Sequence, residues 1–268
     1  MPLLEAQHLV KTFGRRTVVK GADIRLESGT IVGFLGRNGA GKTTIFQMIV
    51  GLLRPDAGSI RLDGRNITRW PTGKRAAAGV TYLPQESSVF LKTTASGNLK
   101  LALELLPYSR SERTATAKAL LEEFGLAELA GQPAHSLSGG ERRRLEIARA
   151  LTLRPKFVLL DEPFTGIDPI TILEIQHILL RLRERGIGIL ISDHNVRDTF
   201  KIADRALIID HGEILVEGEP TEVAANPLAR EKFLGTEFAF GGERVGQDLR
   251  EAMRSPSVSP RKKRNRKK

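Results

Sequence analysis

The chain has 268 residues, no cysteine and a formal net charge of +11 at pH 7. Its length allows one large domain or two small ones, and the lack of cysteine excludes a disulfide framework and thiolate metal sites. No apolar run approaches the roughly 18 residues that cross a bilayer, and the start, Met1-Pro2-Leu3-Leu4-Glu5, lacks the basic residues of a signal peptide. We therefore expect a chain that is soluble by itself, with a composition that fits a reducing cytoplasm.

The positive charge is concentrated at one end of the chain. Residues 241–268 hold ten Lys or Arg and three acidic residues, which leaves +4 for residues 1–240. Because the body is only mildly basic, its charge gives little reason to propose nucleic-acid binding.

The N-terminal part is predicted to be β structure. Residues 3–10 and 18–26 have strand patterns and flank a turn at Gly14-Arg15-Arg16. Phe13 closes the first strand, where the pattern alone favours a core or turn aromatic. The apolar run Ile31-Val32-Gly33-Phe34-Leu35 then indicates a buried strand.

A glycine-rich loop follows this buried strand and fits the phosphate-loop pattern of Gly, four free positions, then Gly-Lys-Thr. It consists of Gly36, Arg37, Asn38, Gly39, Ala40, Gly41, Lys42, Thr43 and Thr44. The glycines let backbone N–H groups turn inward around a phosphate, and the helix expected over residues 43–50 adds the positive end of its dipole. In such a loop Lys42 reaches the β- and γ-phosphates and Thr43 ligates Mg²⁺. The strand before and the helix after the loop disfavour the alternative, a chance turn.

Turn and strand signals continue to residue 85. Gly51 ends the helix, Pro55-Asp56-Ala57-Gly58 is a turn, and a strand leads into a second turn at Asp63-Gly64. A further strand over residues 79–85 is stopped by its proline, beside Gln85.

The pattern changes between about residues 90 and 154, where leucines and alanines recur at helical spacing and strand signals vanish. We interpret this stretch as an inserted helical subdomain. Near its end, Ser138-Gly139-Gly140 opens a helix that runs to Leu153, and such a helix start is a second site for an anion. Taken alone, a serine N-cap followed by glycines is unremarkable.

Two acids follow the next apolar strand. Residues 157–160 run directly into Asp161 and Glu162, which places both carboxylates at the carboxyl end of a buried strand, where open α/β sheets bind ligands. An acid at this position is the expected Mg²⁺ partner of a phosphate loop. The alternative is a strand that simply ends in solvated acids.

The last third of the chain alternates between helix and strand. A helix over residues 172–182 precedes a strand over 187–192, which delivers Asp193 and His194. A lone histidine is usually structural or merely exposed, but its place at the end of a strand in this architecture makes a functional role about equally favoured. A hairpin over 206–216 and a short helix over 227–234 close the predicted fold.

Over residues 1–240 these motifs together resemble the nucleotide-binding subunit of ATP-binding cassette (ABC) transporters. The most specific element is Leu137-Ser138-Gly139-Gly140-Glu141, the family's signature, which lies about twenty residues before Asp161-Glu162. The resemblance implies an α/β fold, a P-loop NTPase (RecA-like) core with an N-terminal antiparallel β subdomain and an inserted α-helical subdomain that carries the signature. It also implies a head-to-tail homodimer that binds two ATP molecules, each between the phosphate loop of one subunit and the signature of the other.

The resemblance also implies catalytic and metal-binding roles. Gln85 would contact Mg²⁺ or the attacking water and link the site to the membrane partner. Asp161 would hold Mg²⁺ through water, together with Thr43. Glu162 would act as general base or orient the water, and His194 would contact the γ-phosphate as a switch residue.

Nucleotide contacts are implied for further positions. Phe13 would stack on adenine, against the interpretation from its pattern alone, and Ser138-Gly139-Gly140 would bind phosphate. Asp168 would be an acid at the boundary between subunits. Two departures from the family are minor, because Phe13 replaces a commoner tyrosine and Glu141, which replaces a commoner glutamine, lies beyond the two glycines.

Within the family the chain most resembles the ATPases that power lipopolysaccharide export. The resemblance rests mainly on Asp193-His194-Asn195-Val196-Arg197 and on the loop Phe164-Thr165-Gly166. It implies transmembrane permease subunits of the lipopolysaccharide-export (Lpt) type, docked near Phe90, and a peripheral position on the cytoplasmic face of the inner membrane.

Three other functions are weighed against this one. The ATPase of branched-chain amino-acid importers shares the scaffold. A soluble cassette ATPase of translation or DNA repair usually joins two cassettes or inserts long coiled arms, and this sequence has neither. A regulator without turnover is disfavoured because both Glu162 and His194 are present.

Residues 241–268 lie outside the resemblance and are predicted to be a disordered tail that ATP hydrolysis does not need. Ser255-Pro256-Ser257-Val258-Ser259-Pro260 cannot propagate a helix, and residues 261–268 are basic at every position except Asn265. Such a segment buries too little surface to offset the entropy of ordering it. A solvated tail and a tail held at the anionic cytoplasmic leaflet both remain open, and RNA binding would show the same salt sensitivity.

Overall fold

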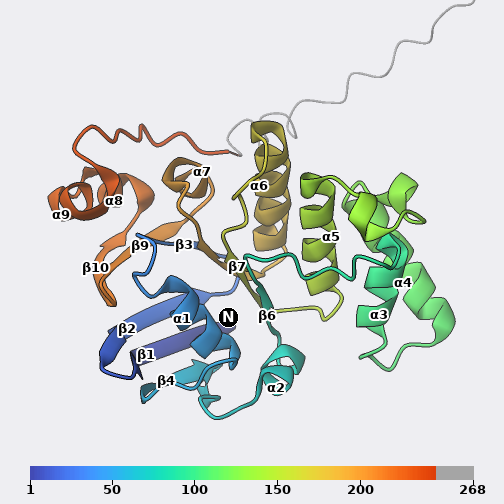
Figure 1. The fold of residues 1–268 in the computed structure, drawn as a ribbon, viewed down its shortest axis with the longest axis horizontal. Helices are drawn as coiled ribbons and strands as arrows, with labels where there is room; N and C mark the ends of the chain where they lie inside the picture. Colours follow the sequence, from blue (N-terminus) through green and yellow to red (C-terminus); the bar gives the residue numbers. More distant parts are fainter. Residues whose placement is uncertain (246–268) are drawn as a thin grey trace, which may run out of the picture.

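The computed structural model describes residues 1–245, and the predicted basic tail from residue 246 onward lies outside the described residues. Two sheets and a set of helices make up the fold (Figure 1). The strands are β1 Leu3–Phe13, β2 Arg16–Glu27, β3 Ile31–Gly36, β4 Ala57–Leu62, β5 Arg65–Asn66, β6 Val80–Leu83, β7 Phe157–Asp161, β8 Gly188–Ser192, β9 Arg205–Asp210 and β10 Glu213–Gly218. The helices are α1 Lys42–Val50, α2 Thr72–Ala77, α3 Ala95–Leu103, α4 Arg110–Glu123, α5 Gly139–Leu151, α6 Pro169–Glu184, α7 Val196–Phe200, α8 Pro220–Ala225 and α9 Pro227–Ala229.

The larger sheet has six strands in the order β10-β9-β3-β8-β7-β6. Its strands from β9 to β6 are parallel, and β10 joins the edge antiparallel to β9. β3, β7 and β8 are buried along their whole length, as expected for central strands with both faces covered. This order brings the carboxyl ends of β3, β7 and β8 to one edge of the sheet, where ligands bind in open α/β folds.

The smaller sheet is antiparallel, with the order β2-β1-β4-β5. Its apolar side chains share one core with α1 and one face of the larger sheet, for example Leu4, Ile60, Phe46 and Leu159. Helix α1 therefore lies between the two sheets (Figure 1). The predicted fold class is confirmed: a parallel α/β core with an N-terminal antiparallel β part.

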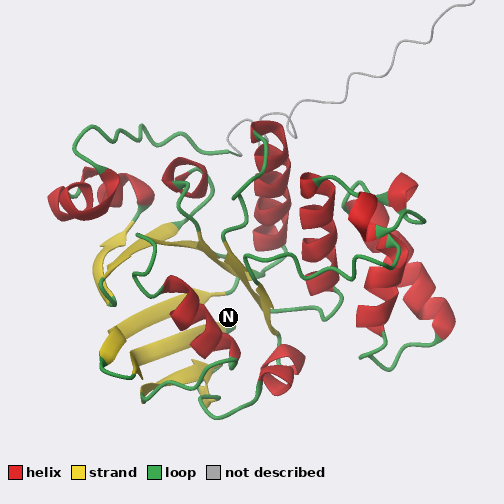
Figure 2. Ribbon diagram, viewed as in Figure 1, coloured by secondary structure: helices red, strands yellow, loops and turns green. Residues whose placement is uncertain are grey.

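Helices α3, α4 and α5 gather at one side of the molecule (Figure 2). Between residues 90 and 154 the structure contains helices, two short 3₁₀ turns and one isolated bridge, Thr94 to Pro133. One continuous core, which includes Leu99, Leu121 and Leu145, joins these helices to α6 and the larger sheet. The sequence pattern does not predict α2 and α8, which span six residues each.

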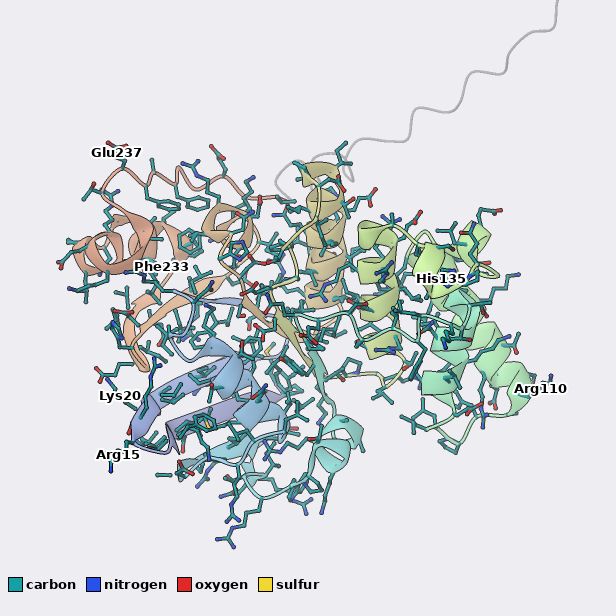
Figure 3. The ribbon with its side chains drawn as sticks, in the orientation of Figure 1. Arg15, Lys20, Arg110, His135, Phe233 and Glu237 are labelled. Atoms are coloured by element: carbon teal, nitrogen blue, oxygen red, sulfur yellow. The ribbon has the colours of Figure 1, made fainter. Side chains whose placement is uncertain are left out.

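The C-terminal segment covers α7. After α9 a π-helical turn, Arg230–Leu234, leads to Phe238 and Phe240, whose rings lie 6.1 and 5.3 Å from that of Phe200. Figure 3 shows Phe233 and Glu237 on this segment, far from Arg110 on α4 at the opposite end of the molecule.

Residues 241–245 also contact the body, which corrects the expectation that the tail begins at 241. Arg244 donates a hydrogen bond to the Ala203 carbonyl (3.0 Å), and the Val245 backbone donates to that of Lys201 (3.1 Å). The physical reason is that the segment between α7 and β9, residues 201–204, offers carbonyl acceptors beside the chain. Among residues 1–245, no helix combines the length and apolar character that a bilayer span needs.

Candidate functional site

The phosphate loop connects β3 to α1, and within it the Ala40 N–H donates to the Arg37 carbonyl (3.1 Å). Gly41, the N-cap of α1, has φ 111°, and no side chain caps the helix. A Cβ on Gly36 would lie 2.3 Å from the Ile209 carbonyl oxygen, so only glycine fits there. The uncapped N–H groups at this helix start can therefore bind an anion.

Lys42 is folded over this loop. Its Nζ donates to the carbonyl oxygens of Gly36 (2.6 Å) and Arg37 (3.2 Å). Burial lowers the pKa of Lys42 below its ordinary value, and the nearby carboxylates of Glu162 and Asp161 oppose that shift. A bound phosphate would replace the two carbonyls with a full negative charge.

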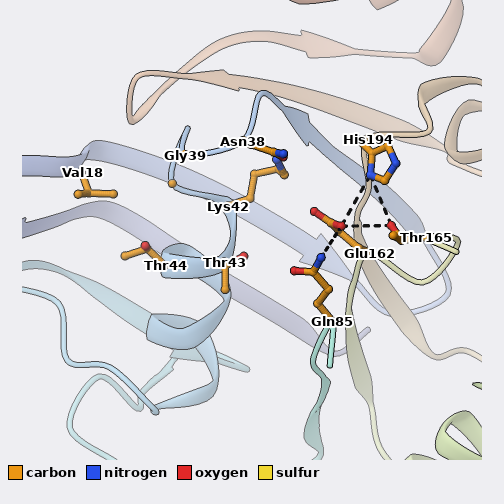
Figure 4. A pocket seen from close by; sticks show the side chains of 11 residues that line it. Val18, Asn38, Gly39, Lys42, Thr43, Thr44, Gln85, Glu162, Thr165 and His194 are labelled. Carbon is orange, nitrogen blue, oxygen red and sulfur yellow. Dashed lines mark hydrogen bonds and ion pairs between the residues drawn. The ribbon is translucent and has the colours of Figure 1, made fainter. Parts of the chain in front are cut away.

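A pocket of about 610 Å³ opens in front of the loop (Figure 4). It brings together residues from the phosphate loop, the segment after β6, the segment after β7 and the segment after β8. Its lining consists of Val18, Asn38, Gly39, Gly41, Lys42, Thr43, Thr44, Gln85, Glu162, Thr165 and His194.

Glu162 is at the centre of a hydrogen-bonded group in this pocket (Figure 4). Its Oε2 accepts from Gln85 Nε2 (2.8 Å) and from Thr165 Oγ1 (3.1 Å), and His194 Nδ1 lies 3.7 Å away. Its backbone has φ 47°, a conformation that costs free energy for a non-glycine residue, and its N–H donates to the Ser192 carbonyl (2.7 Å). The fold therefore holds this carboxylate toward the pocket at some cost in strain.

Asp161 and Asp193 lie buried behind Glu162. Asp161 accepts from the hydroxyls of Tyr82 (3.1 Å) and Ser192. Burial raises the pKa of Tyr82, and the Asp161 carboxylate raises it further. Asp193 accepts from the backbone N–H groups of Phe164 and Asn195, yet burial raises its pKa above the ordinary value.

The signature residues lie outside this pocket. Ser138 and Gly139 are exposed at the start of α5, and Ser138 forms a capping box with Glu141. Gly140 is buried against α6. A Cβ at this position would lie 2.4 Å from the Thr171 side chain. Asp168 caps α6 beside it, accepting from the backbone N–H groups of Ile170 and Thr171. Within one chain, these predicted phosphate contacts and the phosphate loop line different surfaces.

The remaining predicted contacts also lie outside the pocket lining. Phe13 is half exposed at the end of β1, with Lys11 Nζ 5.6 Å from its ring centre. Arg37 is exposed, and Ala40 is buried in the core between the sheets.

Sequence reasoning missed two lining residues, Val18 and Thr165. Thr165 carries a signal, since it is a hydroxyl three residues beyond Glu162, whereas Val18 has only a strand pattern.

Carboxylate, amide and imidazole side chains lie in front of the phosphate loop in this pocket. This arrangement is that of a phosphate-loop ATPase. Residues 19–165 match the ABC transporter family, so the chain belongs to that family. It is the ATP-binding subunit of an ABC transporter and hydrolyses ATP.

The comparisons include two relatives with the same description, lipopolysaccharide export system ATP-binding protein LptB. The Acidithiobacillus ferridurans protein is 52% identical over 88% of this chain and 98% of the relative. The Escherichia coli K12 protein is 45% identical over 89% of this chain and 99% of the relative.

Among solved structures, an ATP-binding cassette of an ABC transporter in its ADP conformation matches with a TM-score of 0.79 and 26% identity. The match covers 88% of this chain and 99% of that one.

Proposed function

We propose that this chain hydrolyses ATP to power extraction of lipopolysaccharide from the inner membrane and its export to the outer membrane. The carrying observation is the 52% identity to an LptB protein over 98% of that relative's length. The amino-acid importer ATPase is the second candidate, and the resemblance in residues 193–197 favours export over it.

In the proposed ATP site one chain supplies the phosphate loop, Lys42 and the groups that position the water. Backbone N–H groups of the phosphate loop and Lys42 bind the β- and γ-phosphates, while Phe13 stacks on adenine. Glu162 orients or deprotonates the attacking water. Its Oε2 is held by Gln85 and Thr165, which leaves Oε1 free to face the water. His194, more than half exposed, contacts the γ-phosphate.

The residues present fit a magnesium ion. Asp161 is a buried carboxylate that accepts only from hydroxyls and forms no ion pair within residues 1–245. With the Thr43 hydroxyl and the Gln85 amide oxygen it gives an all-oxygen donor set, which Mg²⁺ prefers. These residues would hold the ion, which would neutralise charge on the phosphates.

The proposal includes a head-to-tail homodimer, in which Ser138-Gly139-Gly140 of one subunit contact the γ-phosphate held by the other. Supporting this, the start of α5 is exposed and lies outside the pocket of its own chain. Asp168, which caps α6 beside Gly140, would lie at the same boundary.

Permease subunits are proposed to dock around Phe90. Phe90 and Leu91 are 53% and 47% exposed on the loop that follows Gln85, and exposed apolar side chains next to a catalytic group favour an interface. Asn98 of α3 fixes the loop, since it accepts from the Phe90 N–H (2.8 Å) and donates to its carbonyl (3.1 Å). Docking there places the chain on the cytoplasmic face of the inner membrane.

The test is purification of the full chain with Lpt-type permeases, followed by ATPase and lipopolysaccharide-release assays in proteoliposomes. Phe90→Ala should weaken assembly or coupling while the isolated subunit stays folded. Leu228→Ala, an exposed apolar residue of α9 at the other end of the molecule, is the matched control. Failure of the wild type to assemble with these permeases would contradict the export role. Normal transport by Phe90→Ala would contradict the docking site.

A further inference from the structure

Helix α5 carries a buried row of charged side chains directed at the loop that contains Gln85. Arg143, Glu146 and Arg149 follow one another at a spacing of three residues, so they share one face of the helix. Arg143 and Glu146 are only 6% and 4% exposed. Burying an ion pair costs desolvation free energy, so a gain in stability does not by itself explain why this row is buried.

Glu146 ties the loop to α5 through both carboxylate oxygens. Its Oε1 accepts from the Ser87 hydroxyl (2.6 Å) and from the Ser88 backbone N–H (3.0 Å). Its Oε2 accepts from Arg143 Nη1 (2.8 Å). Charge-assisted hydrogen bonds of this kind are the stronger ones in proteins.

The ion pair also contacts the residue that precedes Gln85 in the chain, Pro84. Arg143 Nη1 donates to the Pro84 carbonyl (3.3 Å), and its Nη2 lies within 3.4 Å of the Asp161 carbonyl. The segment is therefore fixed just before Gln85 and just after it. Gln85 then donates to Glu162 Oε2 at 2.8 Å.

We propose that Glu146 is a positioning residue for ATP hydrolysis, which holds the loop on α5 so that Gln85 meets Glu162. In the head-to-tail dimer, on which this step rests, Ser138 at the start of α5 serves the partner's ATP, whereas Gln85 serves the ATP of its own chain. Helix α5 and its ion pair then link the two ATP sites of the dimer.

A positioning role and a merely structural role differ in how mutations combine. If Glu146 acts through Gln85, its substitution has no further effect on kcat once Gln85 is removed. A structural role instead gives losses that add. The cycle uses the full chain with the single variants Glu146→Gln and Gln85→Ala and the double variant.

We expect Glu146→Gln to lower kcat by about tenfold with KM for ATP nearly unchanged, since small misplacements of catalytic groups cost such factors. In the Gln85→Ala background the same change should leave kcat within about twofold. Glu174→Gln is the matched control, because Glu174 pairs with Arg144 of α5 but does not touch the loop; its kcat should stay near wild type.

A second variant keeps the test decisive if Glu146→Gln fails to fold. Ser87→Ala removes one hydrogen bond to Glu146 and leaves the buried ion pair in place; it should lower kcat severalfold, and only when Gln85 is present. Losses that add in both cycles, or wild-type kcat in both single variants, would overturn the inference. Neither result bears on turnover or transport by the wild type, so the proposed export function would stand.

Discussion

The starts of α1 and α5 are both glycine-rich helix N-termini, yet the chain treats them differently. The first turn of α1 has no side-chain cap, and Gly41 adopts a left-handed conformation before it. The first turn of α5 is closed by its own capping box, formed by Ser138 and Glu141. Glu162, Gln85 and His194 line the pocket in front of α1.

The difference suits the two helix ends to the complementary roles proposed for them. The phosphate loop leads into a helix start without a side-chain cap, beside Glu162, the proposed catalytic carboxylate, which suits it to bind phosphate within its own chain. The signature offers an exposed, already capped helix end that keeps its structure without ligand. Such an end suits a surface that meets a nucleotide presented by another copy.

The largest effect is expected in front of α1, from Glu162→Gln. The amide keeps the size and one acceptor but loses the charge that orients the water, so kcat should fall by about 10²–10³. ATP should accumulate in a closed dimer, which size-exclusion chromatography with ATP would detect. Turnover near the wild-type rate would contradict the role of Glu162.

The next effect concerns the far end of α1, where Arg75 is buried and forms no ion pair with an acid among residues 1–245. It donates to the carbonyls of Met48 and Ile49 in the last turn and to those of Thr68 and Trp70, and burial lowers its pKa to about 10. Arg75→Leu removes these hydrogen bonds to four carbonyls, of which that of Met48 keeps one from the Gly51 N–H (3.2 Å), so we expect a loss of about 2–4 kcal/mol in the free energy of unfolding.

Chemical denaturation measures that loss. Arg65→Leu is its control, since the exposed Arg65 guanidinium lies 4.6 Å from the Trp70 ring centre and donates no side-chain hydrogen bond within residues 1–245; its stability should stay within about 0.5 kcal/mol of the wild type. Equal stability of Arg75→Leu and the wild type would show that α1 is not anchored this way.

At the start of α5, Ser138→Asp separates helix capping from phosphate binding. Aspartate caps helices as well as serine does, so the Tm should hardly change, but its charge should repel the partner's γ-phosphate and lower kcat by about tenfold or more. Ser109→Asp in the equivalent capping box of α4 is the matched control. Identical ATPase rates for the Ser138 and Ser109 variants would contradict a role for the start of α5 in binding the partner's phosphate.

The smallest effect is a pH dependence at Lys42. Burial lowers its pKa below the 10.5 of an ordinary lysine, so the unfolded chain holds this proton to a higher pH than the folded chain. The wild-type free energy of unfolding, relative to Lys42→Met, should therefore rise between the lowered pKa and 10.5. ATP affinity should fall over the same window, because phosphate binds the charged form. Denaturation near pH 7 and pH 10 tests this; a constant difference would contradict it.

Much of this fold could be predicted from the sequence, because its central strands are continuous apolar runs and glycines mark the ends of α1, at Gly51, and α6, at Gly186. Residues 157–160 predict β7 in this way, and the order of motifs predicts that Glu162 and Lys42 approach each other. The pattern could not predict α2, whose six residues lack an apolar period.

The charged row of α5 could not be predicted either. Arg143 and Glu146 have the residue types of a solvated helix face, and only the packed structure supplies the Ser87, Ser88 and Pro84 partners that make their burial tolerable. Val18 reaches the pocket through the placement of β2, which pairs with its sequence neighbour β1 but also bonds to a distant residue, because the Lys20 N–H donates to the Gly212 carbonyl (2.9 Å).

We propose that each hydrolysis site combines the start of α1 from one chain with the start of α5 from another. Mixing two inactive variants is the sharpest test of this arrangement. Lys42→Ala disables the phosphate loop, and Ser138→Arg disables the signature. In a head-to-tail dimer, a mixed pair keeps one intact site, so unfolding and refolding the two together should restore up to about a quarter of wild-type ATPase activity. A mixture no more active than its separate components would contradict the claim, because a site contained within one chain cannot be repaired by mixing.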